Sequence, residues 1–156
     1  PEMSPSEVCA RVNRVLAGNL AAGNFVTFFY SVIDAKTGEL TYSNAGHTPP
    51  ILVRADGSLQ RLDSGGALLG VFKHWAFEQA AVRLNKGDRI LLFTDGITEL
   101  KDDAEEEFGE ERLERFAVRN RGESAGVLKE RILAEAADFA NGAFQDDVTV
   151  VVVGVQ

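Results

Sequence analysis

Two apolar segments that each meet a carboxylate are the feature that most constrains this chain. Residues 89–94 are apolar enough for a central strand, and they lead directly into Asp95. Near the C-terminus, Asp146 and Asp147 stand directly before residues 148–155, a run so apolar that we expect a sheet covered on both faces around it. The sequence therefore predicts acidic side chains at the ends of two central strands.

An ionised carboxylate at such a place is costly unless a positive group shares its site. Clustered oxygen ligands suit a hard divalent cation such as Mg or Mn. The competing interpretation is structural, because Asp-Gly is a common turn dipeptide and an acid before a strand often only caps it. A hairpin turn at Asp95 would need another alternating strand, whereas the acidic run 101–107 predicts a surface loop. The pattern thus favours a cation site.

Three segments, in this order and spacing, resemble a known superfamily over nearly the whole chain. Residues 91–99 and 146–151 resemble the late metal motifs of the metal-dependent PP2C-type protein phosphatases. Residues 42–50, Tyr-Ser-Asn-Ala-Gly-His-Thr-Pro-Pro, are similar to its bacterial sporulation-stage-II-E and RsbU branch. The resemblance implies an α+β fold with two antiparallel β-sheets sandwiched between α-helices. The hairpins and late helices of the sequence agree with that class.

The resemblance also implies a function. Asp95 and Asp146 become ligands of a binuclear Mn²⁺ or Mg²⁺ site, and a water activated between the metals hydrolyses phosphoserine or phosphothreonine. Because side chains alternate along a strand, Asp147 is expected to point away from the metals. The implied substrate is a small regulatory phosphoprotein, of the anti-sigma-factor antagonist type. No catalytic or substrate-binding side chain is assigned.

The sequence departs from the family pattern in one respect. Members of this branch carry an earlier Asp followed closely by Gly-His-Gly, and this chain has no such segment. We expect residues 1–156 to be a single PP2C-like domain that lacks its N-terminal strands and its first metal motif. The alternative is a catalytically inactive phosphatase-like module that binds or regulates a partner.

Composition excludes other classes of protein. The net charge is −8, and no basic face appears, which argues against nucleic-acid binding. No apolar run approaches the length of a membrane span, so we expect no membrane insertion. The single Cys9 lies on the apolar side of a helical pattern, where it is expected as a core residue in a reducing, cytoplasmic protein. A fused upstream sensor domain and a homodimer stay open.

Local patterns predict one helix, several strands, two helices and a final strand. Ser4 and Glu7 form a capping box that begins a helix over residues 5–17. Apolar faces predict helices over 110–119 and 124–141. Turn residues between apolar runs predict three hairpins. They join residues 25–34 to 39–44, residues 51–54 to 58–62, and residues 77–84 to 89–94.

For several further features we prefer a structural role. His47, at a strand exit, is expected to fix the shape of a loop and not to act as a general acid or ligand. The glycines at 65–66 and 70 lack the lysine and helix start of a phosphate loop and predict a tight bend. The His-Trp pair at 74–75 is expected in a packing or partner-facing patch, and the glutamates at 105–107 in solvent.

Overall fold

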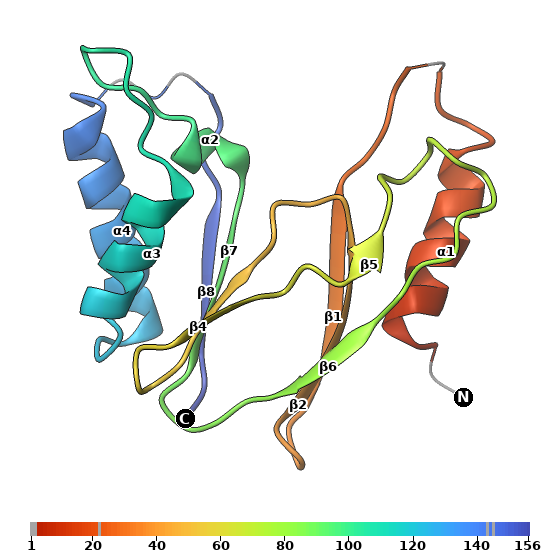
Figure 1. The fold of residues 1–156 in the computed structure, drawn as a ribbon, viewed down its shortest axis with the longest axis horizontal. Helices are drawn as coiled ribbons and strands as arrows, with labels where there is room; N and C mark the ends of the chain where they lie inside the picture. Colours follow the sequence, from red (N-terminus) through yellow and green to blue (C-terminus); the bar gives the residue numbers. More distant parts are fainter. Residues whose placement is uncertain (1–2, 22, 143, 145) are drawn as a thin grey trace. The chain divides into compact units, whose positions relative to one another are not determined.

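The structure, a computed structural model, describes residues 3–21, 23–142, 144 and 146–156. Its helices and strands form two compact units (Figure 1). The first unit consists of Pro1–Pro49 and Leu62–Leu84, and the second of Pro50–Arg61 and Asn85–Gln156. Each unit has its own sheet and its own helices, so each is described by itself.

The first unit packs helix α1 (Pro5–Leu16) on a four-stranded sheet. The strands are β1 (Phe28–Asp34), β2 (Glu39–Ala45), β5 (Gly65–Gly66) and β6 (Ala80–Arg83). Strand β2 lies at the centre, where it pairs antiparallel with β1 and β6 and parallel with β5. The hairpin predicted between the first two strands is confirmed, with Asp34 opposite Glu39.

Helix α1 begins where its local sequence predicts. The Ser4 backbone N–H and its hydroxyl both donate to Glu7 Oε2, each at 2.8 Å, and Pro5 occupies the first turn. These hydrogen bonds hold the pKa of Glu7 below its ordinary value. Cys9 is buried against the sheet, and burial raises the pKa of its thiol, as suits a core residue.

The second unit is built on a sheet with the order β4-β3-β7-β8. Its strands are β3 (Ile51–Val53), β4 (Leu59–Arg61), β7 (Arg89–Phe93) and β8 (Val150–Gly154), and its helices are α2 (Asp95–Thr98), α3 (Glu110–Arg119) and α4 (Ala125–Phe139). Helices α3 and α4 lie along one face of this sheet (Figure 1). The apolar faces of α3 and α4 fill the core, which confirms the two predicted helices. The antiparallel pairing of β3 with β4 confirms the predicted hairpin.

The predicted α+β class with two mostly antiparallel sheets is confirmed, but the third hairpin is wrong. Strand β6 pairs with β2, whereas β7 pairs with β3 and β8. Directly before β7, the Asp88 carboxylate accepts hydrogen bonds from Arg54 at 2.8 Å and from the Ala55 N–H at 3.1 Å. These bonds tie the segment before β7 to the β3–β4 hairpin and not to β6.

A second expectation fails at β8. Within the described residues this strand is an outer strand of its sheet, and Val151 is 48% exposed. Val150 and Val152 pack on the core, and Val151, which alternates with them, points the other way. The valine run is therefore covered on one face. Among the described residues, none of the helices has the length and apolarity that a membrane crossing requires.

Candidate functional site

The two acidic segments meet at one end of the β7–β8 pair. These strands are antiparallel, with Phe93 opposite Val150, so the end of β7 lies beside the start of β8. The pairing continues past the strands: the Thr94 N–H donates to the Thr149 carbonyl at 3.1 Å, and the Thr149 N–H donates to Thr94 Oγ1 at 3.1 Å. One residue further on, the chain reaches Asp95.

Gly96 makes the close approach possible. A Cβ at this position would lie 2.4 Å from the Asp147 carbonyl oxygen, a distance that no larger residue could tolerate without a shift. The hydroxyl of Thr94 also points to that carbonyl, at 3.4 Å. The segment that carries Asp95 is therefore in direct backbone contact with the segment that carries Asp146, as the sequence predicted for the two strand ends.

Asp95 opens helix α2 and is not part of a hairpin turn. Its side chain is exposed, and its Oδ1 accepts the Gly96 N–H at 3.0 Å. Its backbone carbonyl accepts the Thr98 hydroxyl at 3.1 Å and the Glu99 N–H at 2.8 Å. The backbone thus sets the turn, and most of the carboxylate stays available.

The acidic run that follows is a surface loop, as predicted. Asp102 organises it by accepting the N–H groups of Ala104 at 2.8 Å and Glu106 at 3.0 Å. Lys101 pairs with Glu105 at 3.2 Å on the surface. The three glutamates at 105–107 are exposed, and they contribute nothing to the contact between the two strand ends.

The positions of Asp146 and Asp147 differ from the prediction, which applied the side-chain alternation of the last strand to both residues. Both precede β8, which begins at Val150, so strand alternation does not decide which of them faces a metal. Both are exposed, and both line a cavity of about 590 Å³ beside α4. Asp146 Oδ1 accepts the Asp147 N–H at 2.7 Å. Asp147 is the residue whose carbonyl contacts Gly96, and the ligand role of Asp146 stays a prediction.

The donor set of the described residues is incomplete for a binuclear centre. Asp95 and Asp146 offer carboxylate oxygens, which suit Mn²⁺ or Mg²⁺. Within the described residues, no group of three or more His, Cys, Asp or Glu side chains is placed to hold a metal ion. The two aspartates therefore fit a metal as part of a larger ligand set.

His47 belongs to the first unit, where its backbone shapes a loop. Its N–H donates to Asn44 Oδ1 at 2.8 Å, and its carbonyl accepts from Asn44 Nδ2 at 2.9 Å. Thr27 Oγ1 lies 3.4 Å from His47 Nδ1. The loop is fixed by the side chain of the buried Asn44, which sequence reasoning missed, and a loop-fixing role of the His47 side chain stays a prediction. An asparagine before Ala-Gly in a turn was the available signal.

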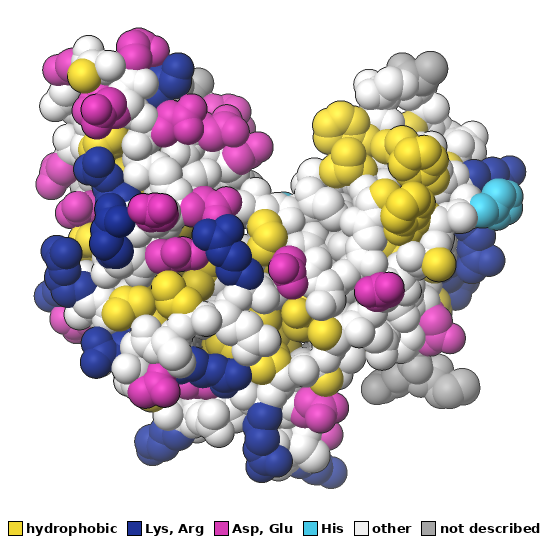
Figure 2. Space-filling view, viewed as in Figure 1, with side chains coloured by type: hydrophobic (Ala, Val, Ile, Leu, Met, Phe, Trp, Pro, Cys, Tyr) yellow, Lys and Arg dark blue, Asp and Glu magenta, His cyan; other side chains and the backbone are white. Residues whose placement is uncertain are grey.

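The tight bend predicted at Gly65 and Gly66 is wrong, because these residues form strand β5, which pairs with β2 and packs closely. A Cβ at Gly65 would meet the Asn44 carbonyl oxygen at 1.9 Å, and one at Gly66 would meet the Trp75 indole at 2.5 Å. Trp75 is 43% exposed and contacts Phe72 with ring centroids 5.3 Å apart. Figure 2 shows hydrophobic side chains gathered on the surface of the unit that contains α1, and many acidic side chains on the other unit.

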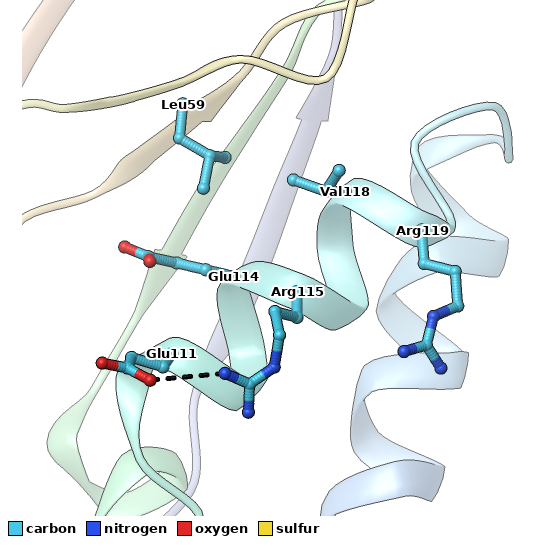
Figure 3. A pocket seen from close by; sticks show the side chains of 6 residues that line it. All are labelled: Leu59, Glu111, Glu114, Arg115, Val118 and Arg119. Carbon is cyan, nitrogen blue, oxygen red and sulfur yellow. Dashed lines mark hydrogen bonds and ion pairs between the residues drawn. The ribbon is translucent and has the colours of Figure 1, made fainter.

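A further pocket of the second unit lies along α3 (Figure 3). Leu59 and Val118 form its apolar part, and charged side chains of α3 surround them. These charges are largely paired with one another: Arg115 contacts Glu111 at 3.3 Å, and Glu114 contacts an arginine of β4 at 2.8 Å. The pocket offers no group suited to catalysis.

Comparison with known proteins agrees with this geometry. Residues 1–156 match the family model described as Stage II sporulation protein E (SpoIIE). Phosphoserine phosphatase RsbU of Bacillus subtilis is 31% identical over 150 residues, which cover 95% of this chain and 44% of RsbU. Protein IcfG of Synechocystis is 32% identical over 130 residues, which cover 83% of this chain and 20% of IcfG.

Among solved structures, the SiaA-PP2C domain of Pseudomonas aeruginosa has a TM-score of 0.85 at 17% identity, covering 98% of this chain and 61% of that one. The fold is therefore that of the PP2C-type phosphatase domains. The family match is narrower, and this chain belongs to the SpoIIE family, in the same branch as RsbU. The chain spans less than half of RsbU and a fifth of IcfG.

The role of Asp95 can be tested through stability. We expect Asp95→Asn, measured in chelator, to leave the melting temperature unchanged or to raise it slightly. Asn keeps an oxygen for the Gly96 N–H, and removing one exposed negative charge from a chain of net charge −8 changes the stability by no more than about 0.5 kcal/mol. Differential scanning fluorimetry measures the shift. A clear drop would mean that the charge stabilises the turn, against a ligand role.

Proposed function

We propose that this chain is part of a metal-dependent protein phosphatase that removes phosphate from phosphoserine or phosphothreonine of a regulatory protein. The observation that carries the proposal is the contact of Gly96 with the Asp147 backbone, which brings two acidic segments to one end of the β7–β8 pair. Membership of the SpoIIE family supports it, because the related RsbU is named a phosphoserine phosphatase. By the same relationship we propose an anti-sigma-factor antagonist as the substrate.

In this proposal Asp95 and Asp146 supply two of the ligands of a Mn²⁺ or Mg²⁺ pair. A carboxylate from a segment that precedes residue 1 completes the set, so that residues 1–156 form most of one PP2C-like domain. When bound, the metals lower the pKa of a water and neutralise phosphoryl oxygens. Asp95 and Asp146 hold the metals in place, and the Gly96–Asp147 contact keeps their two segments together.

The competing function is a phosphatase-like module that binds a partner without hydrolysis. It is favoured by one observation, the absence of a group of three metal-binding side chains within the described residues. The sequence upstream of residue 1 discriminates between the two functions. An Asp-x-x-Gly-His-Gly segment there supports the enzyme, and its absence supports the module.

Activity of the complete protein tests the proposal directly. A phosphoserine-bearing antagonist protein is incubated with the complete protein in Mn²⁺, and the released phosphate is measured. We expect metal-dependent release that chelator abolishes and that adding Mn²⁺ back restores. If the same preparation leaves the phosphoserine intact in both Mn²⁺ and Mg²⁺, the module is the correct description.

A related prediction concerns residues 1–156 by themselves. We expect this chain to bind divalent metal weakly and to hydrolyse p-nitrophenyl phosphate poorly or not at all. Affinity for a hard cation follows ligand number and charge, and two carboxylates do not replace the full set. Calorimetric titration with Mn²⁺ and a colorimetric assay check both statements. Robust Mn²⁺-dependent turnover by this chain alone would show that the missing ligand is not essential.

A further inference from the structure

Three arginines line one pocket of the second unit. The pocket measures about 490 Å³, and it lies where the start of β7 meets the end of α3. Arg89, Arg119 and Arg121 line it, together with Ala55, Gly87 and Gly122. Every charged side chain in this lining is therefore basic, in a protein whose net charge is −8.

Two of the three guanidinium groups are held in place by backbone carbonyls. Arg89 donates to the Glu123 carbonyl at 3.1 and 2.7 Å, to that of Gly87 at 3.1 Å and to that of Asp88 at 3.0 Å. Arg121 donates to the carbonyls of Ala55 at 3.1 Å and Val118 at 3.0 Å. Carbonyl dipoles fix the orientation of these cations, but they do not neutralise a full positive charge.

The third guanidinium has no partner within the described residues. Arg119 is exposed, near the end of α3, and the structure shows neither a hydrogen bond nor an ion pair from its side chain to any described residue. Its position at the end of α3 is seen in Figure 3. It is therefore free to contact a ligand without breaking an existing interaction.

Other arginines of the same unit behave differently, and the contrast is informative. Four of them pair with carboxylates: Arg54 with Asp88, Arg61 with Glu110 and Glu114, Arg115 with Glu111, and Arg131 with Glu123. Asp88 and Glu123, which adjoin lining residues in the sequence, are thus already engaged. Asp88 is 1% exposed and faces Arg54, and the Glu123 carboxylate lies 3.1 Å from Arg131. The pocket keeps a surplus of positive charge.

We propose that this pocket binds the phosphate group of a small molecule. Guanidinium groups match the geometry of phosphate oxygens and bind them through paired, charge-assisted hydrogen bonds. The volume lies within the usual range of about 300–1,000 Å³ for small-molecule sites. Gly87 and Gly122 also line the pocket, and without side chains they let a ligand approach the backbone closely.

The site is separate from the candidate metal centre. Arg89 begins β7, and Asp95 follows the other end of that strand. At about 3.3 Å per residue, the two positions are about 20 Å apart. The inference does not depend on the proposed phosphatase activity, and the ligand acts at a site of its own.

Titration in chelator, at constant ionic strength, tests the proposal without a contribution from metal-bound phosphate. Inorganic phosphate, pyrophosphate and ADP are added separately to the protein and followed by calorimetry and by the amide signals of Gly87 and Gly122. We expect saturable binding to one site, tighter for pyrophosphate than for phosphate. Equal affinities for pyrophosphate and ADP would indicate recognition of the phosphates alone, and tighter binding of ADP would indicate a nucleotide ligand.

The decisive variant is Arg119→Gln, because the Arg119 side chain is exposed and makes no hydrogen bond or ion pair with the described residues, so its loss should not unfold the protein. We expect it to weaken binding about tenfold and to suppress the shifts at both glycines. Arg115→Gln is the matched control, since it removes the same charge from the same helix outside this pocket, and it should change affinity less than twofold. No saturable binding of any of the three compounds, or equal weakening in both variants, would overturn the proposal.

Discussion

Asp146→Asn in the complete protein should lower kcat by more than about a hundredfold, because loss of a ligand charge weakens the hold on the metals. Asp147→Asn should change kcat by less than about threefold. Asp147 contacts Gly96 through its backbone carbonyl, which the substitution keeps, so Asp147→Asn leaves the contact between the two segments intact. Asn at position 146 also keeps an oxygen for the Asp147 N–H, so the local turn is preserved.

The measurement is phosphate release from a phosphoserine protein at saturating Mn²⁺, with the Mn²⁺ dissociation constant determined in parallel. Melting temperatures of both variants should stay near that of the unmodified protein, since both side chains are exposed. A pure folding defect would instead lower the rate of phosphate release and the melting temperature together. If Asp147→Asn abolishes activity and Asp146→Asn spares it, the two residues exchange roles and Asp147 is the ligand.

Asp88→Ala should lower the free energy of unfolding by about 3–5 kcal/mol, the range for breaking a buried ion pair. Asp88 is 1% exposed, and its carboxylate accepts hydrogen bonds from Arg54 at 2.8 Å, from the Asn85 N–H at 2.9 Å and from the Ala55 N–H at 3.1 Å. The substitution removes the carboxylate that pairs with Arg54, whose side chain is 20% exposed, and leaves two backbone donors without an acceptor.

Urea unfolding followed by circular dichroism gives the free energy. Asp56→Ala is a suitable control, because Asp56 is an exposed acid of the neighbouring hairpin whose carboxylate accepts the Ser58 N–H at 2.8 Å and the Ser58 hydroxyl at 2.7 Å. Its loss should have a much smaller effect. Similar losses in the two variants would mean that burial at Asp88 does not amplify the interaction.

Features that depend on neighbours along the chain could be predicted from the sequence. The capping box of Ser4 and Glu7 places the start of α1, and the bounds of α3 were predicted without error. Both depend on contacts between residues three or four positions apart, and such contacts can be predicted directly from the local sequence. The turn between β1 and β2 also depends on residues close together in the sequence, and it was predicted correctly.

Pairing across long separations in sequence could not be predicted in the same way. The alternation of residues 77–84 and 89–94 suits a hairpin, yet Asp88 bonds to Arg54 and Ala55, 34 and 33 residues away, and places β7 in another sheet. Asn44 is a similar case, because its amide bonds to the Leu62 carbonyl 18 residues ahead as well as to His47. The hydrophobic pattern of a strand shows which of its faces is buried, but it does not show which other strand pairs with it.

In the candidate metal site and the arginine pocket, too, local features could be predicted from the sequence and long-range contacts could not. The sequence by itself determined that Asp95 and Asp146 lie beside apolar segments, because apolarity and the position of an acid are local properties. Only the tertiary structure decided that Gly96 contacts the Asp147 backbone, and that Arg89 lies in one pocket with Arg119 and Arg121. The reason is that strand order and helix packing set these distances, through contacts between residues that are remote in the chain.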